Sequence, residues 1–276
     1  MPKVTTDDGV ELHYHVDDFR DPWAPETDEA IFMHHGYARS MKWWIQWVPG
    51  LSRKYKVIRN DCRGCGHSQV PPAGTPWTAE RLAEDALAIA DHAGIKKFHW
   101  IGFESGGTIG MVFAINHPER IKSLTLVNSP YKILDKPRSL YVQGTASMAD
   151  GVEKLGLRQW LINTWPNRMD MDLADPKMLE WHLDEHSKTP HEVAVGLHYI
   201  VQTADVSGAL SKIQAPTLLM TGDKSANSPI DDQLFIRSQL PDCRGLVVFP
   251  NVAAGIQLLM PDRCVEETLR FIDSLD

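Results

Sequence analysis

The sequence is poor in cysteine, with only four among 276 residues. A chain of this length with so few cysteines is expected to carry reduced thiols rather than a disulfide framework. Its longest apolar runs have the length of strands, so the sequence predicts no membrane-spanning helix and no membrane partner. The net charge of −8 at pH 7 argues against nucleic acids and anionic membrane surfaces as partners.

The first residues, MPKVTTDD, lack the apolar core of a signal peptide, which makes the cytoplasm the expected location. One C-x-x-C motif is present, at Cys62 and Cys65. No second pair follows at ligand spacing, so we interpret the motif as part of a tight glycine-rich loop rather than a zinc or redox site. We therefore expect neither a metal nor a cofactor.

A length of 276 residues suits one large α/β domain that contains an insertion. Short apolar runs, typical of buried strands, alternate with helical patterns over most of the chain. This alternation lapses between residues 131 and 210, where the pattern is helical and rich in large side chains. The expected strands include residues 30–33, 56–60, 98–101, 121–128, 217–220 and 245–249.

The most informative stretch runs from residue 100 to 107, WIGFESGG. An apolar run leads into Gly102, and a helical pattern follows, which is the setting of a nucleophile elbow. In the pattern G-x-S-x-G the third residue stands on a strained turn above a parallel sheet. Here the third residue is Glu104, and Ser105 follows it. A one-residue shift would place Ser105 at the apex, but it removes the spacing between the serine and the next small residue that the turn needs.

Three further motifs accompany this stretch: HHGY at 34–37, DCRGCGHS at 61–68 and PTLLMTG at 216–222. In this order the four motifs resemble the α/β-hydrolase fold, and most closely the small ester, enol-lactone and C–C-bond hydrolases. The resemblance implies an α/β protein with a mostly parallel central sheet, helices on both faces and a helical cap insertion. On that basis we expect the core at residues 1–130 and 211–276, and the cap at residues 131–210.

In such hydrolases the loop after an early strand and the residue after the nucleophile supply the two N–H groups of the oxyanion hole. The resemblance assigns these roles to the loop at Gly36 and Tyr37 and to Ser105. A histidine in this loop, here His35, is more often a hydrogen-bonded support than a catalyst. We nevertheless include His35 among the candidate pocket residues.

The catalytic triad of the family is missing. The acid is expected either at the end of the strand after the elbow or in a turn after residue 221, where this chain has Asn128 and Ser225. Counting back from Pro261 places the histidine position at Ala254, and the alternative frame places it at Ile256. No histidine follows residue 198, so the usual serine–histidine–aspartate chemistry is excluded.

The cap contributes many aromatic and methionine side chains, which indicates an apolar pocket. The expected partner is a small hydrophobic molecule, with aromatic molecules among the candidates, and the protein is expected to be a monomer or a homodimer. The candidate pocket residues are His35, Phe103, Trp160, Trp165 and Ile256.

The leading hypothesis makes Glu104 a general base. No cationic neighbour is evident in the sequence, so burial is expected to raise the pKa of this carboxyl towards neutrality. A base of this kind could drive an elimination, an isomerisation or a Kemp-type ring opening. The alternatives are a hydrolase that uses Glu104 as base or nucleophile on a small ester, lactone, halide or epoxide, and a catalytically inactive ligand-binding scaffold. Because three catalytic positions differ on an intact scaffold, an engineered active site is a further hypothesis.

Overall fold

The computed structural model describes residues 2–23, 29–133 and 135–275. Within these residues eight strands form one sheet in the order β1-β2-β4-β3-β5-β6-β7-β8. β1 pairs with β2, and β2 with β4, in antiparallel fashion, whereas the strands from β4 to β8 are parallel. The strands are Lys3–Thr5 (β1), Glu11–Asp17 (β2), Ala30–His34 (β3), Lys56–Asn60 (β4), Phe98–Phe103 (β5), Ile121–Val127 (β6), Thr217–Gly222 (β7) and Cys243–Phe249 (β8).

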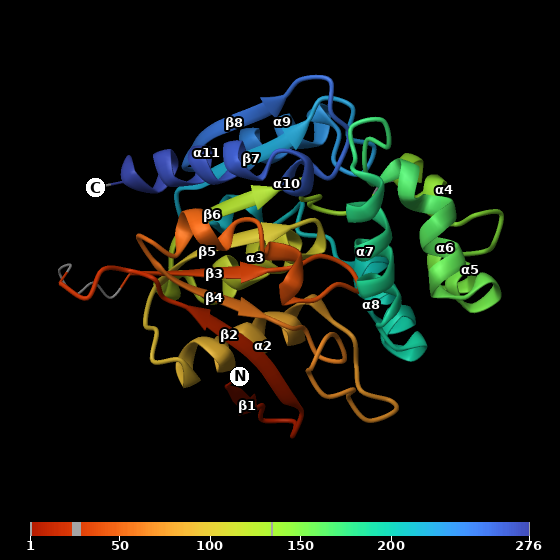
Figure 1. The fold of residues 1–276 in the computed structure, drawn as a ribbon, viewed down its shortest axis with the longest axis horizontal. Helices are drawn as coiled ribbons and strands as arrows, with labels where there is room; N and C mark the ends of the chain where they lie inside the picture. The colour runs from red at the N-terminus through yellow and green to blue at the C-terminus, as the bar shows by residue number, and fades with distance from the viewer. Residues whose placement is uncertain (1, 24–28, 134, 276) are drawn as a thin grey trace.

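Helices cover both faces of the sheet (Figure 1). α2 packs on α3 on one face, and α1 packs on α11 on the other. The core helices are Val48–Leu51 (α1), Ala79–His92 (α2), Ser105–Asn116 (α3), Ile230–Gln239 (α9), Ile256–Leu259 (α10) and Pro261–Asp273 (α11). Short 3₁₀ turns lie at Met41–Trp44 (η1), Pro118–Arg120 (η2), Trp165–Asn167 (η3) and Leu210–Lys212 (η4). This architecture is the predicted α/β-hydrolase fold.

The central strands are buried on both faces, which explains why they are continuous apolar runs rather than alternating ones. Every residue of β3 and of β5 is buried. The adjoining helix α2 is amphipathic: Thr78 caps its first turn by accepting a hydrogen bond from the Arg81 amide at 3.0 Å. Gly94 follows the helix with a φ of +72°, the left-handed conformation that favours glycine after a helix end.

A second group of helices is inserted between β6 and β7, at the carboxyl ends of the parallel strands (Figure 1). These helices are Asp135–Tyr141 (α4), Met148–Leu155 (α5), Leu157–Thr164 (α6), Pro176–Ser187 (α7) and His191–Thr203 (α8). Two hydrogen bonds tie them to the loop after β3. Thr189 Oγ1 donates to the Ala38 carbonyl at 2.8 Å, and Tyr37 Oη donates to the Ala194 carbonyl at 3.1 Å. The inserted helices are therefore anchored directly above the ends of the strands.

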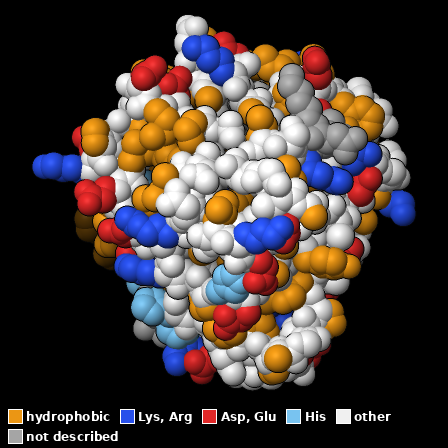
Figure 2. Space-filling model, turned by 90° about the vertical axis from the view of Figure 1, so that its right-hand side faces the viewer, with side chains coloured by type: hydrophobic (Ala, Val, Ile, Leu, Met, Phe, Trp, Pro, Cys, Tyr) orange, Lys and Arg blue, Asp and Glu red, His pale blue; other side chains and the backbone are white. Residues whose placement is uncertain are grey.

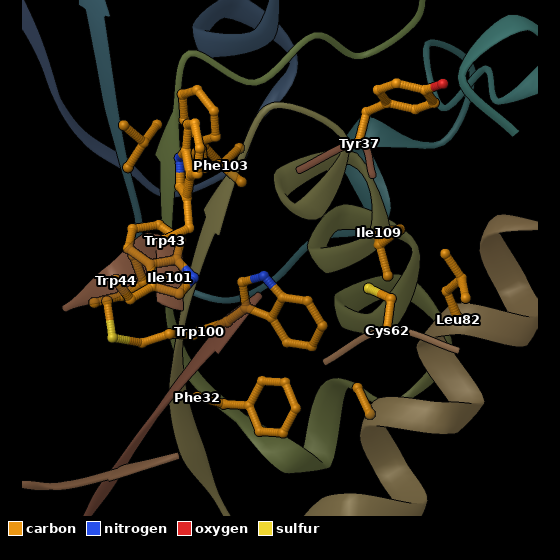
Figure 3. Packing of buried hydrophobic residues seen from close by; sticks show 14 of the residues in the cluster. Phe32, Tyr37, Trp43, Trp44, Cys62, Leu82, Trp100, Ile101, Phe103 and Ile109 are labelled. Carbon is orange, nitrogen blue, oxygen red and sulfur yellow. The ribbon is translucent and has the colours of Figure 1, made fainter. Parts of the chain in front are cut away.

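The tryptophans after β3 belong to the core. Trp43, Trp44 and Trp47 are all buried. Figure 3 shows Trp43 beside Phe103, while Tyr37 points away from both. Both rings also meet the inserted helices: Trp43 packs against His182 of α7 with centroids 4.3 Å apart, and Tyr37 stacks on His198 of α8 at 4.0 Å.

The turn after β5 depends on glycines that allow close backbone contact. A Cβ atom on Gly106 would lie 2.3 Å from the His34 carbonyl oxygen and 2.5 Å from the His35 carbonyl oxygen. A Cβ atom on Gly102 would lie 2.5 Å from the Gly106 carbonyl oxygen. Backbone atoms cannot rotate away as a side chain can, so the turn and the end of β3 are locked together.

We expect the substitution Gly106→Ala to lower the free energy of unfolding by about 3 kcal/mol, because the added methyl group forces backbone shifts in a packed core. Chemical denaturation checks this value. Gly208→Ala is the matched control, since a Cβ atom there meets nothing within 4 Å. Equal stability of the two variants would contradict the close packing of the turn.

None of the described helices is long and apolar enough to cross a membrane. The four cysteines are free thiols, and Cys62 and Cys65 are buried. Burial raises the pKa of both thiols, so they remain protonated near neutral pH. Across the described part of the chain, no cluster of three or more histidine, cysteine or acidic side chains could hold a metal ion.

Candidate active site

Glu104 occupies the apex of the strand–turn–helix. Its φ of 48° and ψ of −121° lie in a conformation that non-glycine residues rarely adopt. The Glu104 amide donates to the Val127 carbonyl at 3.0 Å, and Ser105 is the first residue of α3. The one-residue shift that would lift Ser105 to the apex is therefore wrong, and the carboxylate stands where the family places a serine.

The carboxylate of Glu104 has a buried cationic partner. Arg39 Nη1 donates to Glu104 Oε2 at 2.5 Å, and both residues are buried. The guanidinium lies between two aromatic rings, with its Cζ 4.2 Å from the centre of Trp43 and 4.7 Å from the centre of Phe103. This stacking holds Arg39 in place beside the turn.

This ion pair corrects the expected ionisation of Glu104. Burial acts to raise the pKa of Glu104, but the charges of Arg39 and Arg168 and the hydrogen bonds from Arg39 and Asn227 outweigh it. The pKa is held below its ordinary value of 4.5, so the side chain is ionised at neutral pH. The expectation of a raised pKa was wrong because it assumed that no cation lay nearby.

The second carboxylate oxygen faces a polar side chain from the loop after β7. Asn227 Nδ2 donates to Glu104 Oε1 at 3.4 Å, a long and therefore weak hydrogen bond. The Asn227 Oδ1 in turn accepts a hydrogen bond from the Tyr141 hydroxyl of α4. A chain of side chains thus connects the carboxylate to the inserted helices and leaves Oε1 less firmly engaged than Oε2.

Glu104 lines a cavity between the ends of the strands and the inserted helices. Its polar lining consists of Tyr37, Glu104, Ser105, Thr108, Lys132, Tyr141, Arg168, His198 and Asn227. Its apolar lining consists of Ile109, Pro130, Ile133, Met148, Ile200, Val201 and Ala204. Apolar walls with a few convergent polar groups are typical of a site for a small molecule.

The loop after β3 lies directly beside the carboxylate. A Cβ atom on Gly36 would lie 3.0 Å from Glu104 Oε2, so only glycine leaves room at this position. His35 supports the loop: its Nε2 accepts from the Cys62 amide at 3.0 Å, so its Nδ1 carries the proton and donates to the Gly36 carbonyl at 2.8 Å. Ser105 begins α3, so its amide has no acceptor one turn earlier in the helix.

His198 reaches the cavity as a neutral imidazole. Tyr37 has one hydroxyl proton, which it donates to the Ala194 carbonyl, so the 3.0 Å contact to His198 requires the histidine Nδ1 to donate to the tyrosine oxygen. Burial and the charge of Arg168 hold the pKa of His198 well below 6.5. His198 therefore adds no positive charge to the cavity near neutral pH.

The positions expected for the acid and the base of the family triad hold side chains that cannot take those roles. Asn128 Oδ1 accepts from Thr221 Oγ1 at 3.0 Å and joins the ends of β6 and β7. Ser225 Oγ accepts from the Ser228 amide at 3.3 Å within the loop after β7. Ala254 is buried and provides no proton acceptor in its side chain. Asp223 holds the last loop by accepting from the Val252 amide at 3.1 Å.

The prediction of the pocket residues from the sequence was wrong. His35, Phe103, Trp160, Trp165 and Ile256 are buried, and none of them lines the cavity that contains Glu104. Phe103 packs under Arg39, and His35 supports the loop. Trp160 lies behind the lining, where its ring packs against His198 with centroids 4.6 Å apart. Phe103 and the two tryptophans therefore pack behind the wall, and the apolar part of the wall consists of aliphatic side chains and Met148.

Sequence reasoning missed the residues that act directly on the charge of Glu104, which are Arg39, Arg168 and Asn227. It also missed the lining residues Thr108, Lys132, Tyr141 and His198. Arg39 is 65 residues and Asn227 is 123 residues from Glu104 in sequence, so no local pattern links them to it. The one available signal was the position of Arg39, a charged residue three positions after Gly36 in the loop that was expected to border the active site.

Comparison with known proteins agrees with this fold. The profile of the alpha/beta hydrolase fold family matches residues 29–258. The chain is 25% identical over 253 residues to 3-oxoadipate enol-lactonase 1 of Acinetobacter baylyi, covering 91% of each protein. It is 25% identical over 285 residues to a non-heme haloperoxidase of Rhodococcus erythropolis, covering 99% of this chain and 100% of the relative.

The same architecture is found among solved structures. The enol-lactonase from Burkholderia xenovorans LB400 superposes with a TM-score of 0.87 at 23% sequence identity, covering 99% of this chain and 100% of that one. The family profile spans most of the chain, including β3, the turn that carries Glu104 and the last loop. The protein therefore belongs to the alpha/beta hydrolase fold family and is a relative of hydrolytic enzymes such as the enol-lactonases.

Proposed function

We propose that this hydrolase-fold enzyme abstracts a proton from an activated carbon of a small, largely apolar substrate, with Glu104 as the general base. The observation that carries the proposal is the ionised carboxylate at the apex of the strained turn, lining the cavity. Oε2 is engaged by Arg39, so Oε1, held only by the long contact to Asn227, is the oxygen that would take the proton.

Negative charge that develops on the substrate would be stabilised by backbone N–H groups. The amides of Tyr37 and Ser105 are the proposed donors, since both residues line the cavity beside Glu104. Such preorganised donors act strongly in a site that excludes water. No histidine is required for this reaction, which fits the loss of the histidine at Ala254.

The ion pair with Arg39 limits the strength of the base. A carboxylate whose pKa lies below 4.5 removes a proton efficiently only from a carbon acid of considerable acidity. A benzisoxazole, whose ring opens when its C3–H bond is cleaved, is a suitable test substrate. The proposed reaction moves the C–H electron pair into a new C≡N bond, breaks the N–O bond and delivers the proton to Glu104.

We expect the rate of benzisoxazole ring opening to be independent of pH near neutrality and to fall only in acid, as Glu104 becomes protonated. The Arg39→Met variant loses the positive charge that counteracts the effect of burial on Glu104. The pKa of Glu104 therefore rises, and the fall in rate moves to higher pH. Rate profiles from pH 3 to 9, within the range where both proteins stay folded, measure the shift. Arg270→Met on the exposed side of α11 is the control, and an unchanged profile for Arg39→Met would contradict this account.

A second function is favoured by the same ionised state. A carboxylate that is ionised at neutral pH is a competent nucleophile towards an alkyl halide or an epoxide. Attack by Oε1 would form a C–O ester bond and release halide, or open the epoxide. Because Ala254 replaces the histidine that would activate water, the ester is expected to persist. Intact mass spectrometry followed by peptide mapping would locate an adduct on Glu104, and the absence of any adduct counts against this function.

A further inference from the structure

Arg168 is held rigidly against the cavity by aromatic rings. It follows η3, and its Cζ lies 4.7 Å from the centre of the Tyr141 ring and 4.8 Å from that of Trp160. The Tyr37 ring is 5.9 Å away on the core side. A guanidinium packed against three rings keeps one orientation, because its side chain has little freedom to rotate.

The guanidinium of Arg168 is only partly satisfied. Its Nε donates to Thr164 Oγ1 at 3.3 Å. Its two terminal nitrogens have no hydrogen-bond acceptor among the residues that the structure describes, and the side chain, 7% exposed, lines the cavity. Neither terminal nitrogen is sealed from solvent, because the cavity reaches both of them. They are therefore positioned to donate to a group that enters the cavity.

The charges around the cavity do not balance. Glu104 is the only carboxylate among the described lining residues, and Arg39 already engages it. Lys132 at the cavity pairs with Asp205 at 3.3 Å. The buried histidines nearest to Arg168, His186 and His198, are neutral because burial holds the pKa of each well below 6.5. The described groups therefore leave one guanidinium charge in excess inside the cavity.

Burying an uncompensated cation costs several kcal/mol unless a counter-ion is supplied. Figure 2 views the side that carries the inserted helices, and there basic and acidic side chains are interspersed over the surface. Any preference for a negatively charged ligand is therefore due to the buried Arg168 and not to a positively charged surface around the cavity.

We infer that the site takes a substrate with one carboxylate, which the terminal nitrogens of Arg168 bind while the apolar part of the molecule lies towards Glu104. The planar, forked guanidinium matches a carboxylate with two parallel hydrogen bonds. A dianion such as a phosphate monoester is disfavoured, because the negative Glu104 lies in the same cavity. This inference names the substrate class of the proposed enzyme and rests on that proposal for the choice of cavity.

The test measures binding without turnover. Phenylacetate and its neutral counterpart phenylacetamide are titrated into the intact protein by calorimetry, with quenching of tryptophan fluorescence as a second readout because Trp160 contacts Arg168. We expect the unchanged protein to bind phenylacetate at least about tenfold more tightly than phenylacetamide. We expect Arg168→Met to bind phenylacetate about 10- to 100-fold more weakly than the unchanged protein does. Arg168→Lys keeps the charge but loses the forked pair of donors. Its affinity for phenylacetate is expected to lie between that of the unchanged protein and that of Arg168→Met.

Arg158→Met, at an exposed arginine of α6, is the matched control and is expected to bind phenylacetate as the unchanged protein does. Glu104→Gln should bind phenylacetate more tightly, because a like charge is removed. Equal affinity for acid and amide, or no loss in either Arg168 variant, would overturn the inference. If the protein opens benzisoxazole but binds phenylacetate and phenylacetamide equally, the proposed function stands and this inference is wrong. If phenylacetate binds preferentially through Arg168 but no ring opening occurs, the carboxylate site stands and the proposed function is wrong.

Discussion

Replacing Glu104 with glutamine is expected to lower kcat/KM for benzisoxazole ring opening by about 10²–10⁴-fold, the usual contribution of a positioned general base. Glutamine keeps the shape of the side chain and a carbonyl oxygen that can still accept from Arg39, but it cannot take a proton. The rate of ring opening is followed by the absorbance of the phenolate product, at saturating and at subsaturating substrate concentrations.

Glu266→Gln is the matched control for this prediction. It makes the same chemical change in α11, where Glu266 pairs with Arg270 at the surface. We expect it to retain full activity. If Glu104→Gln kept more than a tenth of the ring-opening rate, the base would have to be another group.

Single substitutions in the Arg39–Glu104 pair are expected to lower the free energy of unfolding by about 3–5 kcal/mol each, because each leaves a buried charge without its partner. The double variant Arg39→Met/Glu104→Gln removes both charges and is expected to be markedly more stable than the sum of the two losses implies. Urea denaturation of the four proteins gives the coupling free energy directly.

The pH dependence of this coupling has a definite sign. The pKa of Glu104 is lower in the folded protein than its ordinary value of 4.5, so its contribution to stability is fully present above pH 4.5. The contribution is lost as the pH falls through the lower pKa of the folded state. The exposed pair Arg270–Glu266 serves as comparison, with an expected coupling within about 0.5 kcal/mol. Equal coupling in the buried and exposed pairs would contradict the role assigned to Arg39.

The fold could be predicted because its signals are local. Apolar runs of strand length, the cap at Thr78 and the spacing of glycines around Glu104 each depend on neighbours in sequence. The position of Glu104 at the apex follows from the same spacing. Loss of the triad could also be read directly, since Asn128 and Ala254 cannot act as the acid and the base.

The electrostatics of the site could not be predicted in this way. Arg39, Arg168 and Asn227 come from a loop after β3, a turn after η3 and a loop after β7, and only the folded chain brings them to one cavity. Without the position of Arg39, burial alone gave the wrong direction for the pKa of Glu104. Composition also overstated the aromatic lining, because a tryptophan such as Trp160 can be fully buried behind the wall rather than in it.

The measurement that tests the central claim most directly compares ring opening of a benzisoxazole with that of its C3-deuterated form, in the unchanged protein and in Glu104→Gln. If Glu104 removes the proton, the deuterated substrate reacts several-fold more slowly on the unchanged protein, and both rates fall together in the variant. A rate no higher than that of free carboxylate buffer, or a rate that is the same in Glu104→Gln, would contradict the account.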